Sequence, residues 1–216
     1  MYGTNDDLVA GICKTAPWFL GGGLRNPRVL DAMRATDRAE FLPSRSRAWA
    51  YIDAPVEIGD GQTCSQPSLV AFMLDELDLG PGRRVLEIGA GCGYAAAIAA
   101  RLCAPDGVVV AAEIQPALAF LCRANCAVFG PRVEVVEADA STGLPDRDPF
   151  DRILVSAGVR PSSFREELLA ARLSDNGVLI YPERRGLLHR VERRGAAIHR
   201  RTWQGVAFVP LLGLNS

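Results

Sequence analysis

The sequence predicts an α/β fold built on a mostly parallel sheet, and two features of the residue pattern support this prediction. Between residues 84 and 181, short apolar segments alternate with longer segments of helical periodicity. This alternation favours parallel strands joined by right-handed crossovers, with helices on both faces of the sheet. After residue 182 three strand-like segments follow one another at 187–193, 196–203 and 206–211, which indicates an antiparallel hairpin region at the carboxyl end.

The individual elements follow from local signals. Asn26 before Pro27 is typical of a helix start, and Ser65 before Pro67 predicts a second start at which Ser65 is the N-cap. The strands of the core are expected at 84–88, 108–114, 132–138, 150–157 and 177–181. The helices between them are expected at 94–102, 116–129 and 163–173. With 216 residues and 49% hydrophobic content, we expect one domain.

Charge and cysteine content bear on partners and compartment. The 24 basic and 25 acidic residues nearly balance, so the sequence does not favour nucleic acid or an anionic membrane as a partner. The apolar stretch at residues 8–23 lacks a cationic leader and is interrupted by Lys14 and Pro17, which suits neither a signal peptide nor a membrane span. We therefore expect a cytoplasmic protein whose six cysteines are reduced thiols, with no metal site.

A predicted buried strand runs directly into a glycine-rich turn at residues 85–94. In an open parallel sheet this turn lies at the carboxyl ends of the strands, where ligands bind. A dinucleotide-binding turn has the spacing G-x-G-x-x-G, but Tyr94 occupies the place of its third glycine, which disfavours an NAD-dependent dehydrogenase. The spacing here is G-x-G-x-G, with Glu87 two residues before Gly89, and it resembles the first motif of the S-adenosylmethionine-dependent methyltransferases.

Carboxylates also end the next two predicted strands. Glu113 ends the second strand, where a carboxylate can accept hydrogen bonds from both hydroxyls of a ribose. Asp139 ends the third, at the place where methyltransferases of this fold hold the adenine amino group. A helix-capping or solvated role is the simpler interpretation of Glu113 taken alone. The series of three strand ends favours a cofactor that contains a nucleoside.

Residues 51–67 narrow the class further. Their sequence, YIDAPVEIGDGQTCSQP, closely resembles the signature, commonly written G-Q-T-I-S-Q-P, that protein-L-isoaspartate O-methyltransferases carry before their cofactor loop. Residues 28–33 and 41–43 are similar to the entry helix of that family, and residues 206–211 are similar to its closing strand. The resemblance runs from roughly residue 24 to residue 213, and its segments occur in the family's order.

The resemblance implies a Rossmann-like class I S-adenosylmethionine-dependent methyltransferase fold. The single domain, 1–216, would comprise a helical substrate-side segment (1–80), a cofactor-binding core (81–182) and carboxyl-terminal strands (183–216). The family transfers a methyl group from S-adenosyl-L-methionine, leaving S-adenosyl-L-homocysteine, to the α-carboxylate of L-isoaspartyl residues in damaged proteins or peptides. The ester then collapses to a succinimide, which can reopen to aspartate and so initiates repair. The implied partner is a protein or peptide bearing isoaspartate, and we expect a monomer.

Matching positions imply roles for individual residues. Ser65 corresponds to the serine usually regarded as the catalytic residue, where it would hydrogen-bond the substrate carboxylate; the simpler alternative is that it only caps a helix. A carboxylate with a pKa near ~4 is ionised at neutral pH, so the reaction needs placement and no general base. The positions implied to bind the cofactor are Thr63, Cys64, Ser65, Gln66, Glu87, Gly89, Gly91, Gly93, Glu113, Ile114, Asp139 and Ala140.

Some positions depart from the family's pattern. Cys64 replaces an aliphatic residue of the signature, and Cys92 replaces a small serine-like residue in the glycine loop. The loops at 138–140, 156–161 and 181–186 also differ, and they lie on the ligand side in this fold. They carry arginines that can bind a substrate carboxylate, although exposed arginines mostly stay solvated: Arg160, Arg184 and Arg185.

Two alternatives to protein repair stay open at this point. The altered loops motivate a related carboxyl methyltransferase that acts on an aspartate of a dedicated peptide during biosynthesis. A catalytically inactive homologue that binds cofactor or peptide is the other, and the glycine loop, Glu113 and Ser65 weigh against it.

Overall fold

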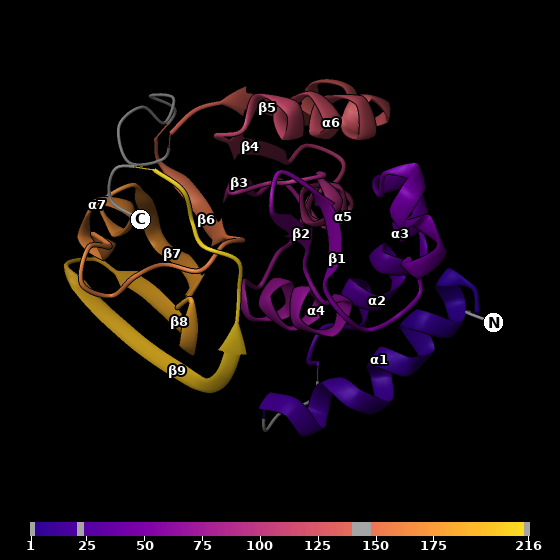
Figure 1. Ribbon diagram of the computed structural model, residues 1–216. Coiled ribbons are helices and arrows are strands. Elements are labelled where there is room, and N and C mark those ends of the chain that lie inside the picture. Colours follow the sequence, from indigo (N-terminus) through magenta and orange to yellow (C-terminus); the bar gives the residue numbers. More distant parts are fainter. Residues whose placement is uncertain (1–2, 21–23, 140–147, 214–216) are drawn as a thin grey trace.

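The computed structural model describes residues 3–20, 24–139 and 148–213, and a seven-stranded sheet forms its centre (Figure 1). The strands lie side by side in the order β5 (Val133–Glu137), β4 (Val108–Glu113), β3 (Arg84–Ile88), β6 (Phe150–Val155), β7 (Leu173–Pro182), β8 (Arg185–Arg194) and β9 (Ala197–Ala207). Neighbours from β5 to β7 are parallel, whereas β8 and β9 pair antiparallel. This confirms the predicted mostly parallel sheet with an antiparallel carboxyl-terminal hairpin.

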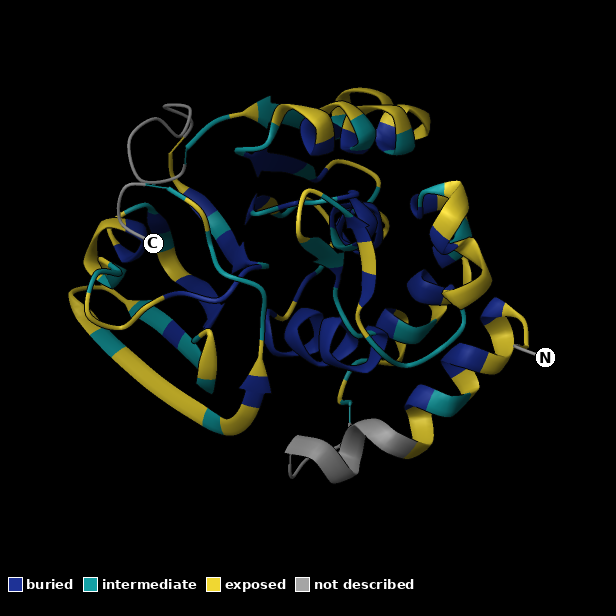
Figure 2. Ribbon diagram, viewed as in Figure 1, coloured by how far each residue is buried: buried dark blue, intermediate teal, exposed yellow. Residues whose placement is uncertain are grey.

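Two apolar cores cover the two faces of the sheet. Alternation along the strands separates them, because Val85 faces the larger core and Leu86 the smaller one. The larger core includes side chains from α1 (Asn5–Leu20), α2 (Pro27–Arg34), α4 (Pro67–Glu76), α5 (Tyr94–Leu102) and α6 (Pro116–Cys126). The smaller core includes Leu169 of α7 (Glu166–Ala170). Figure 2 shows the central strands mostly buried and β9 largely exposed.

Several predicted boundaries were wrong, most clearly those of α7 and β9. The helix expected at 163–173 is the shorter α7, because Leu173 is already part of β7, where it pairs with Phe150. The turn expected near residue 204 and the separate strand at 206–211 are replaced by one continuous strand, β9. Gly205 is an extra residue in β9, between the pairs Leu187–Gln204 and Gly186–Val206, and its φ of 93° is the bulge conformation that glycine tolerates.

Three features before the core were not anticipated: helix α1, a pair of short helices and a small hairpin. Helix α1 accounts for the early apolar stretch, since its Leu8, Val9 and Ile12 are buried in the larger core. Among the helices of the described residues, none has the length and apolar character needed to cross a bilayer. A short helix α3 (Arg38–Phe41) and a 3-10 helix η1 (Ser44–Trp49) follow, and a second 3-10 helix, η2 (Ala127–Arg132), follows α6.

A small hairpin is the third of these features, formed by β1 (Val56–Gly59) and β2 (Gln62–Cys64). Asp60 and Gly61 form its two-residue loop, with φ angles of 51° and 71°. Positive φ at both positions is typical of a type I′ turn, for which the dipeptide Asp-Gly is a known signal. The hairpin presents β2, and hence the segment leading to Ser65, to the glycine loop.

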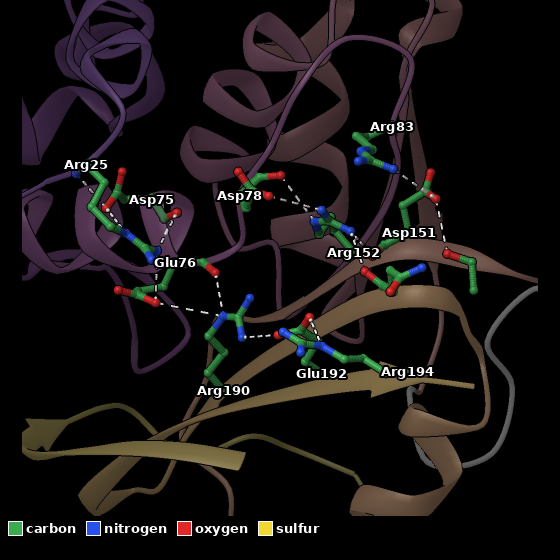
Figure 3. Close-up of polar contacts among 12 residues, drawn as sticks. Arg25, Asp75, Glu76, Asp78, Arg83, Asp151, Arg152, Arg190, Glu192 and Arg194 are labelled. Atoms are coloured by element: carbon green, nitrogen blue, oxygen red, sulfur yellow. Dashed lines mark hydrogen bonds and ion pairs between the residues drawn. The ribbon is translucent and has the colours of Figure 1, made fainter. Parts of the chain in front are cut away.

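Ion pairs fix the carboxyl end of α4 (Figure 3). Asp75 and Glu76 are both buried; Asp75 accepts hydrogen bonds from the backbone N–H groups of Arg25 and Asn26, 2.9 and 2.7 Å away. The carboxylate of Glu76 lies 3.0 Å from the Arg25 guanidinium and 3.8 Å from that of Arg190, which reaches across from β8. These contacts hold α4 against the strands, with its amino end beside the glycine loop.

Candidate active site

The order of the strands reverses at β3. The chain passes from β3 to β4 and β5 toward one edge of the sheet, and it returns on the other side of β3 with β6. Ligands of open α/β sheets bind at such a reversal, beyond the carboxyl ends of the strands. Here Glu87 of β3 accepts a hydrogen bond of 2.6 Å from the hydroxyl of Ser156, which follows β6. These two residues mark the floor of the candidate site.

Glu113 at the end of β4 organises the glycine loop. Its Oε2 accepts a hydrogen bond from the backbone N–H of Gly91 at 2.8 Å, and its Oε1 accepts one from the N–H of Gln115 at 3.0 Å. Gly93 has a φ of 85°, and a Cβ at this position would lie 2.7 Å from Sγ of Cys126 and 2.9 Å from Sγ of Cys122. Glycine at 93 therefore lets the loop pack on α6.

A first cavity, the glycine-loop cavity, lies over the ends of β3 and β4. Its rim includes the carboxyl-terminal segment 209–212, whose place is fixed by hydrogen bonds from Gly158 N–H to Val209 O at 2.7 Å and from Leu211 N–H to Gly158 O at 2.8 Å. The lining residues are Ile58, Gln62, Thr63, Ile88, Gly89, Gly91, Ala112, Glu113, Ile114, Gln115, Leu118, Ala138, Ser156, Ala157, Val209, Pro210, Leu211 and Leu212. Sequence reasoning missed much of this wall, because its residues come from loops that meet only in the folded chain.

A second cavity, the inner cavity, lies beside the first and contains two unpaired polar atoms. Its lining includes Thr63, Ser65, Glu87, Cys92 and Tyr94. Oε2 of Glu87 and the Tyr94 hydroxyl are buried and have no hydrogen-bond partner among the described residues. Buried polar groups almost always have partners, so these atoms indicate a place for a polar group of a ligand.

The environment of Glu87 favours its protonated form. Burial and, to a smaller extent, the nearby carboxylate of Glu113 together raise the pKa of its carboxyl group to about 8, against the opposing effect of the hydrogen bond from Ser156. A cation bound next to the free Oε2 would reverse this effect. The position therefore suits a ligand with a positive group such as an ammonium.

A third cavity, the outer cavity, has a volume of about 260 Å³ and opens between the signature segment and β9. It is lined by Pro55, Thr63, Ser65, Gln66, Leu69, Arg185, Ala207, Phe208 and Val209. Thr63 lines all three cavities, and Ser65 lines both the inner and the outer one. Ser65 therefore stands where a molecule in the outer cavity would meet one in the inner cavity.

Ser65 does not cap α4, so that expectation was wrong. Gln66 occupies the N-cap position, and the helix amide of Ser68 donates instead to Oδ1 of Asp53, 2.8 Å away. The side chain of Gln66 also binds Asp53, with Nε2 3.3 Å from Oδ2. Because Asp53 supplies the cap, the Ser65 hydroxyl is left without a hydrogen-bond partner among the described residues.

A buried arginine, which sequence reasoning missed, holds the segment that contains Ser65 in place. The side chain of Arg38 is inaccessible to solvent and donates to five backbone carbonyls at 2.9 to 3.2 Å. The acceptors are Ala50, Ile52, Ala54, Cys64 and Ser65. In the sequence Arg38 resembles the exposed arginines near it, and only its contacts distinguish it.

Cys64 and Cys92 are neighbours in the inner cavity. The thiol of Cys92 hydrogen-bonds Cys64, and this contact together with the charge of Arg38 lowers the pKa of Cys64 to about 6 despite its burial. The same interaction and burial raise the pKa of Cys92. The pKa of Cys64 is therefore below the ordinary value of a cysteine thiol.

The remaining positions predicted to bind the cofactor do not all lie at the same cavity. Gln66 lines the outer cavity, whereas Gly93 faces α6 and is not among the residues that line the three described cavities. Ala138 lines the glycine-loop cavity, while the carboxylate of the following Asp139 lies close to Gly213. Ala140 lies outside the described residues.

Comparison with solved structures assigns the fold to the class I S-adenosylmethionine-dependent methyltransferases. A protein-L-isoaspartate O-methyltransferase superposes with a TM-score of 0.84 at 26% identity, over 98% of this chain and 67% of that one. A candidate protein-L-isoaspartate O-methyltransferase from Plasmodium falciparum, solved in complex with S-adenosyl-L-homocysteine, superposes with a TM-score of 0.82 at 23% identity, over 97% of this chain and 99% of its own. The second similarity supports the fold alone.

Sequence comparison identifies the family. The model of the protein-L-isoaspartate (D-aspartate) O-methyltransferases matches residues 21–216. A protein-L-isoaspartate O-methyltransferase of Methylorubrum extorquens is 46% identical over 195 residues, which cover 88% of this chain and 82% of the relative. The chain belongs to the protein-L-isoaspartate (D-aspartate) O-methyltransferase family, as the signature at residues 51–67 predicted.

Proposed function

We propose that this protein transfers a methyl group from S-adenosyl-L-methionine to the α-carboxylate of L-isoaspartyl residues in damaged proteins or peptides. The observation that carries the proposal is the position of Ser65 between the inner and the outer cavity. The family membership supports the same activity. The comparisons give no support to a dedicated biosynthetic peptide or to an inactive homologue as the function of this chain.

The residues of the first two cavities suit the cofactor. Glu87 would bind its ammonium group through the unpaired Oε2. Glu113 has room for the ribose hydroxyls, because a carboxylate offers about four acceptor sites and the loop amides occupy two of them. When bound, S-adenosyl-L-methionine supplies an electrophilic methyl group on a positively charged sulfur. Thr63, Cys64, Gly89, Gly91 and Ile114 would form the walls around it.

Ser65 would orient the substrate. The isoaspartyl carboxylate is ionised at neutral pH and needs no general base, so the protein has only to bring its oxygen into line with the methyl group. The Ser65 hydroxyl would donate a hydrogen bond to the second carboxylate oxygen and so fix its direction. A neutral donor suits this role because it leaves the attacking oxygen its charge.

We propose further that the protein works in the cytoplasm as a monomeric, single-domain enzyme that binds neither nucleic acid nor a metal ion. The free thiols of the described cysteines are compatible with a reducing compartment. The near balance of charge, net -1 at pH 7, offers no attraction to a polyanion.

Paired peptides test the activity. The purified protein would be incubated with methyl-labelled S-adenosyl-L-methionine and one of two peptides that differ only in isoaspartate or aspartate at one position. We expect base-labile label on the isoaspartyl peptide and none on its partner. Equal labelling of both peptides, or of neither, contradicts the proposal.

A further inference from the structure

Arg185 gives the outer cavity a positive charge. It is the only charged side chain among the described residues that line this cavity, whose other polar side chains are those of Thr63, Ser65 and Gln66. Arg185 begins β8 and pairs in register with Ala207 of β9, which also lines the cavity. The cavity that receives the substrate in the proposed function is therefore suited to an anion.

This charge has no carboxylate partner among the described residues. Arg185 forms no ion pair with a carboxylate of the described residues, in contrast to Arg190 and Arg194 on the same strand, which both bind Glu192. The nearest carboxylate along the chain, Glu183, is engaged by His189 at 3.0 Å and by the N–H of Leu187 at 3.0 Å. Arg185 is thus available to a ligand.

The reacting carboxylate is a poor partner for this guanidinium. Its negative charge disappears as the ester forms, so a full positive charge beside it would stabilise the ground state more than the transition state. Only interactions that strengthen toward the transition state accelerate the reaction. A second carboxylate that keeps its charge throughout the reaction binds Arg185 equally well in the ground state and in the transition state. The contact then strengthens substrate binding without raising the barrier of the methyl transfer.

We propose that Arg185 binds a second carboxylate of the substrate, on an aspartate or glutamate next to the isoaspartate in the chain. This inference rests on the proposed function and adds a preference to it: the enzyme selects isoaspartate in acidic surroundings. Charge-assisted hydrogen bonds give such contacts their strength and a bidentate geometry.

Two pairs of peptides and two variants test this preference. The peptides carry isoaspartate with either Glu or the isosteric Gln beside it, in one pair before the isoaspartate and in another pair after it. For the wild type we expect a KM about 2- to 5-fold lower with Glu in at least one pair, at similar kcat, as an ion pair of an exposed arginine provides. Arg185→Gln should remove the difference in KM between the Glu and Gln peptides of that pair.

Arg184→Gln is the matched control, because Arg184 is the adjacent exposed arginine and is not among the described residues lining the cavity. It should keep the wild-type preference. A wild type with the same KM for both peptides of each pair overturns the inference, and so does an Arg185→Gln variant that loses activity equally on both. If the wild type methylates no isoaspartyl peptide at all, the proposed function itself has failed. The assay with paired isoaspartyl and aspartyl peptides detects that failure separately from a loss of the preference.

Discussion

The carboxylate of Asp53 lies 2.8 Å from the backbone nitrogen of Ser68 and caps helix α4 from a preceding loop. This contact decides how Ser65, next to the helix start, is used. A serine that capped the helix would spend its hydroxyl on a helix amide, whereas Ser65 keeps its hydroxyl for the boundary between the two cavities. Replacing Asp53 should therefore lower mainly the stability, whereas replacing Ser65 should lower mainly the activity.

Ser65→Ala should lower kcat/KM by about 10- to 100-fold, the value of one hydrogen bond to a charged group, with little change in the free energy of unfolding. Asp53→Ala should instead cost about 1 kcal/mol of stability through the lost cap. Denaturant unfolding and initial rates on the isoaspartyl peptide measure both effects. A Ser65→Ala variant destabilised as much as Asp53→Ala would show that Ser65 caps the helix after all.

Arg38 should act as a positioning residue for the segment of Ser65. Arg38→Lys keeps the charge but cannot reach five carbonyls, so we expect a loss of stability of about 2 kcal/mol or more and a fall in kcat/KM. Arg45→Lys, at an exposed position in η1, is the control and should change neither, because the ion pair of Arg45 with Glu57 is exposed to solvent and a lysine keeps the charge. Full activity of a folded Arg38→Lys enzyme would rule out the positioning role.

Glu87 should release its proton when the cofactor product binds. With a pKa of about 8 the carboxyl group is protonated at pH 7, and a bound ammonium lowers that pKa. Calorimetry of S-adenosyl-L-homocysteine binding in buffers of different ionisation heat should detect proton release at pH 7. Glu87→Gln should bind more weakly and release fewer protons; release as large as that of the wild type would refute the assignment.

The raised pKa of Glu87 also predicts how the free energy of unfolding changes with pH. The folded-state pKa of Glu87, about 8, lies above the ordinary value of 4.5, so its protonated form stabilises the fold fully below pH 4.5. This contribution is lost as the pH rises from 4.5 through 8, by at most roughly 1.4 kcal/mol per pH unit. The free energy of unfolding of wild type relative to Glu87→Gln should therefore fall between pH 5 and pH 8. Parallel pH profiles would contradict the shift.

Cys64 should make the enzyme sensitive to thiol reagents. The hydrogen bond from Cys92 and the charge of Arg38 lower the pKa of Cys64, which lines the inner cavity, so its thiolate forms more readily than that of an ordinary cysteine. Iodoacetamide should inactivate the enzyme, and S-adenosyl-L-homocysteine should protect it. Cys64→Val should lose this sensitivity, whereas Cys13→Ser, which removes the exposed cysteine, should keep it. Inactivation that follows Cys13 instead would exclude Cys64.

Much of the core could be predicted from local pattern. The apolar runs at β3 and β4, the glycine spacing before Tyr94 and the proline that starts α6 are all signals within a few residues of the elements that they define. The ends of α7 and β9 could not be predicted, because pairing with β6 and a bulge at Gly205 decided them. The role of Arg38 could not be predicted for the same reason. Its burial depends on contacts with residues distant along the chain, and not on its neighbours in the sequence.

The sequence by itself determined the alternating strands and helices, the glycine loop with Glu87 and Glu113, and the signature that contains Ser65. Periodicity and spacing express these features directly in neighbouring residues. The tertiary structure decided that Asp53 caps α4, that Arg38 carries the signature segment and that Arg185 faces the outer cavity. Each of these depends on contacts between residues that are distant along the chain, and only the packing of the whole sheet brings them together.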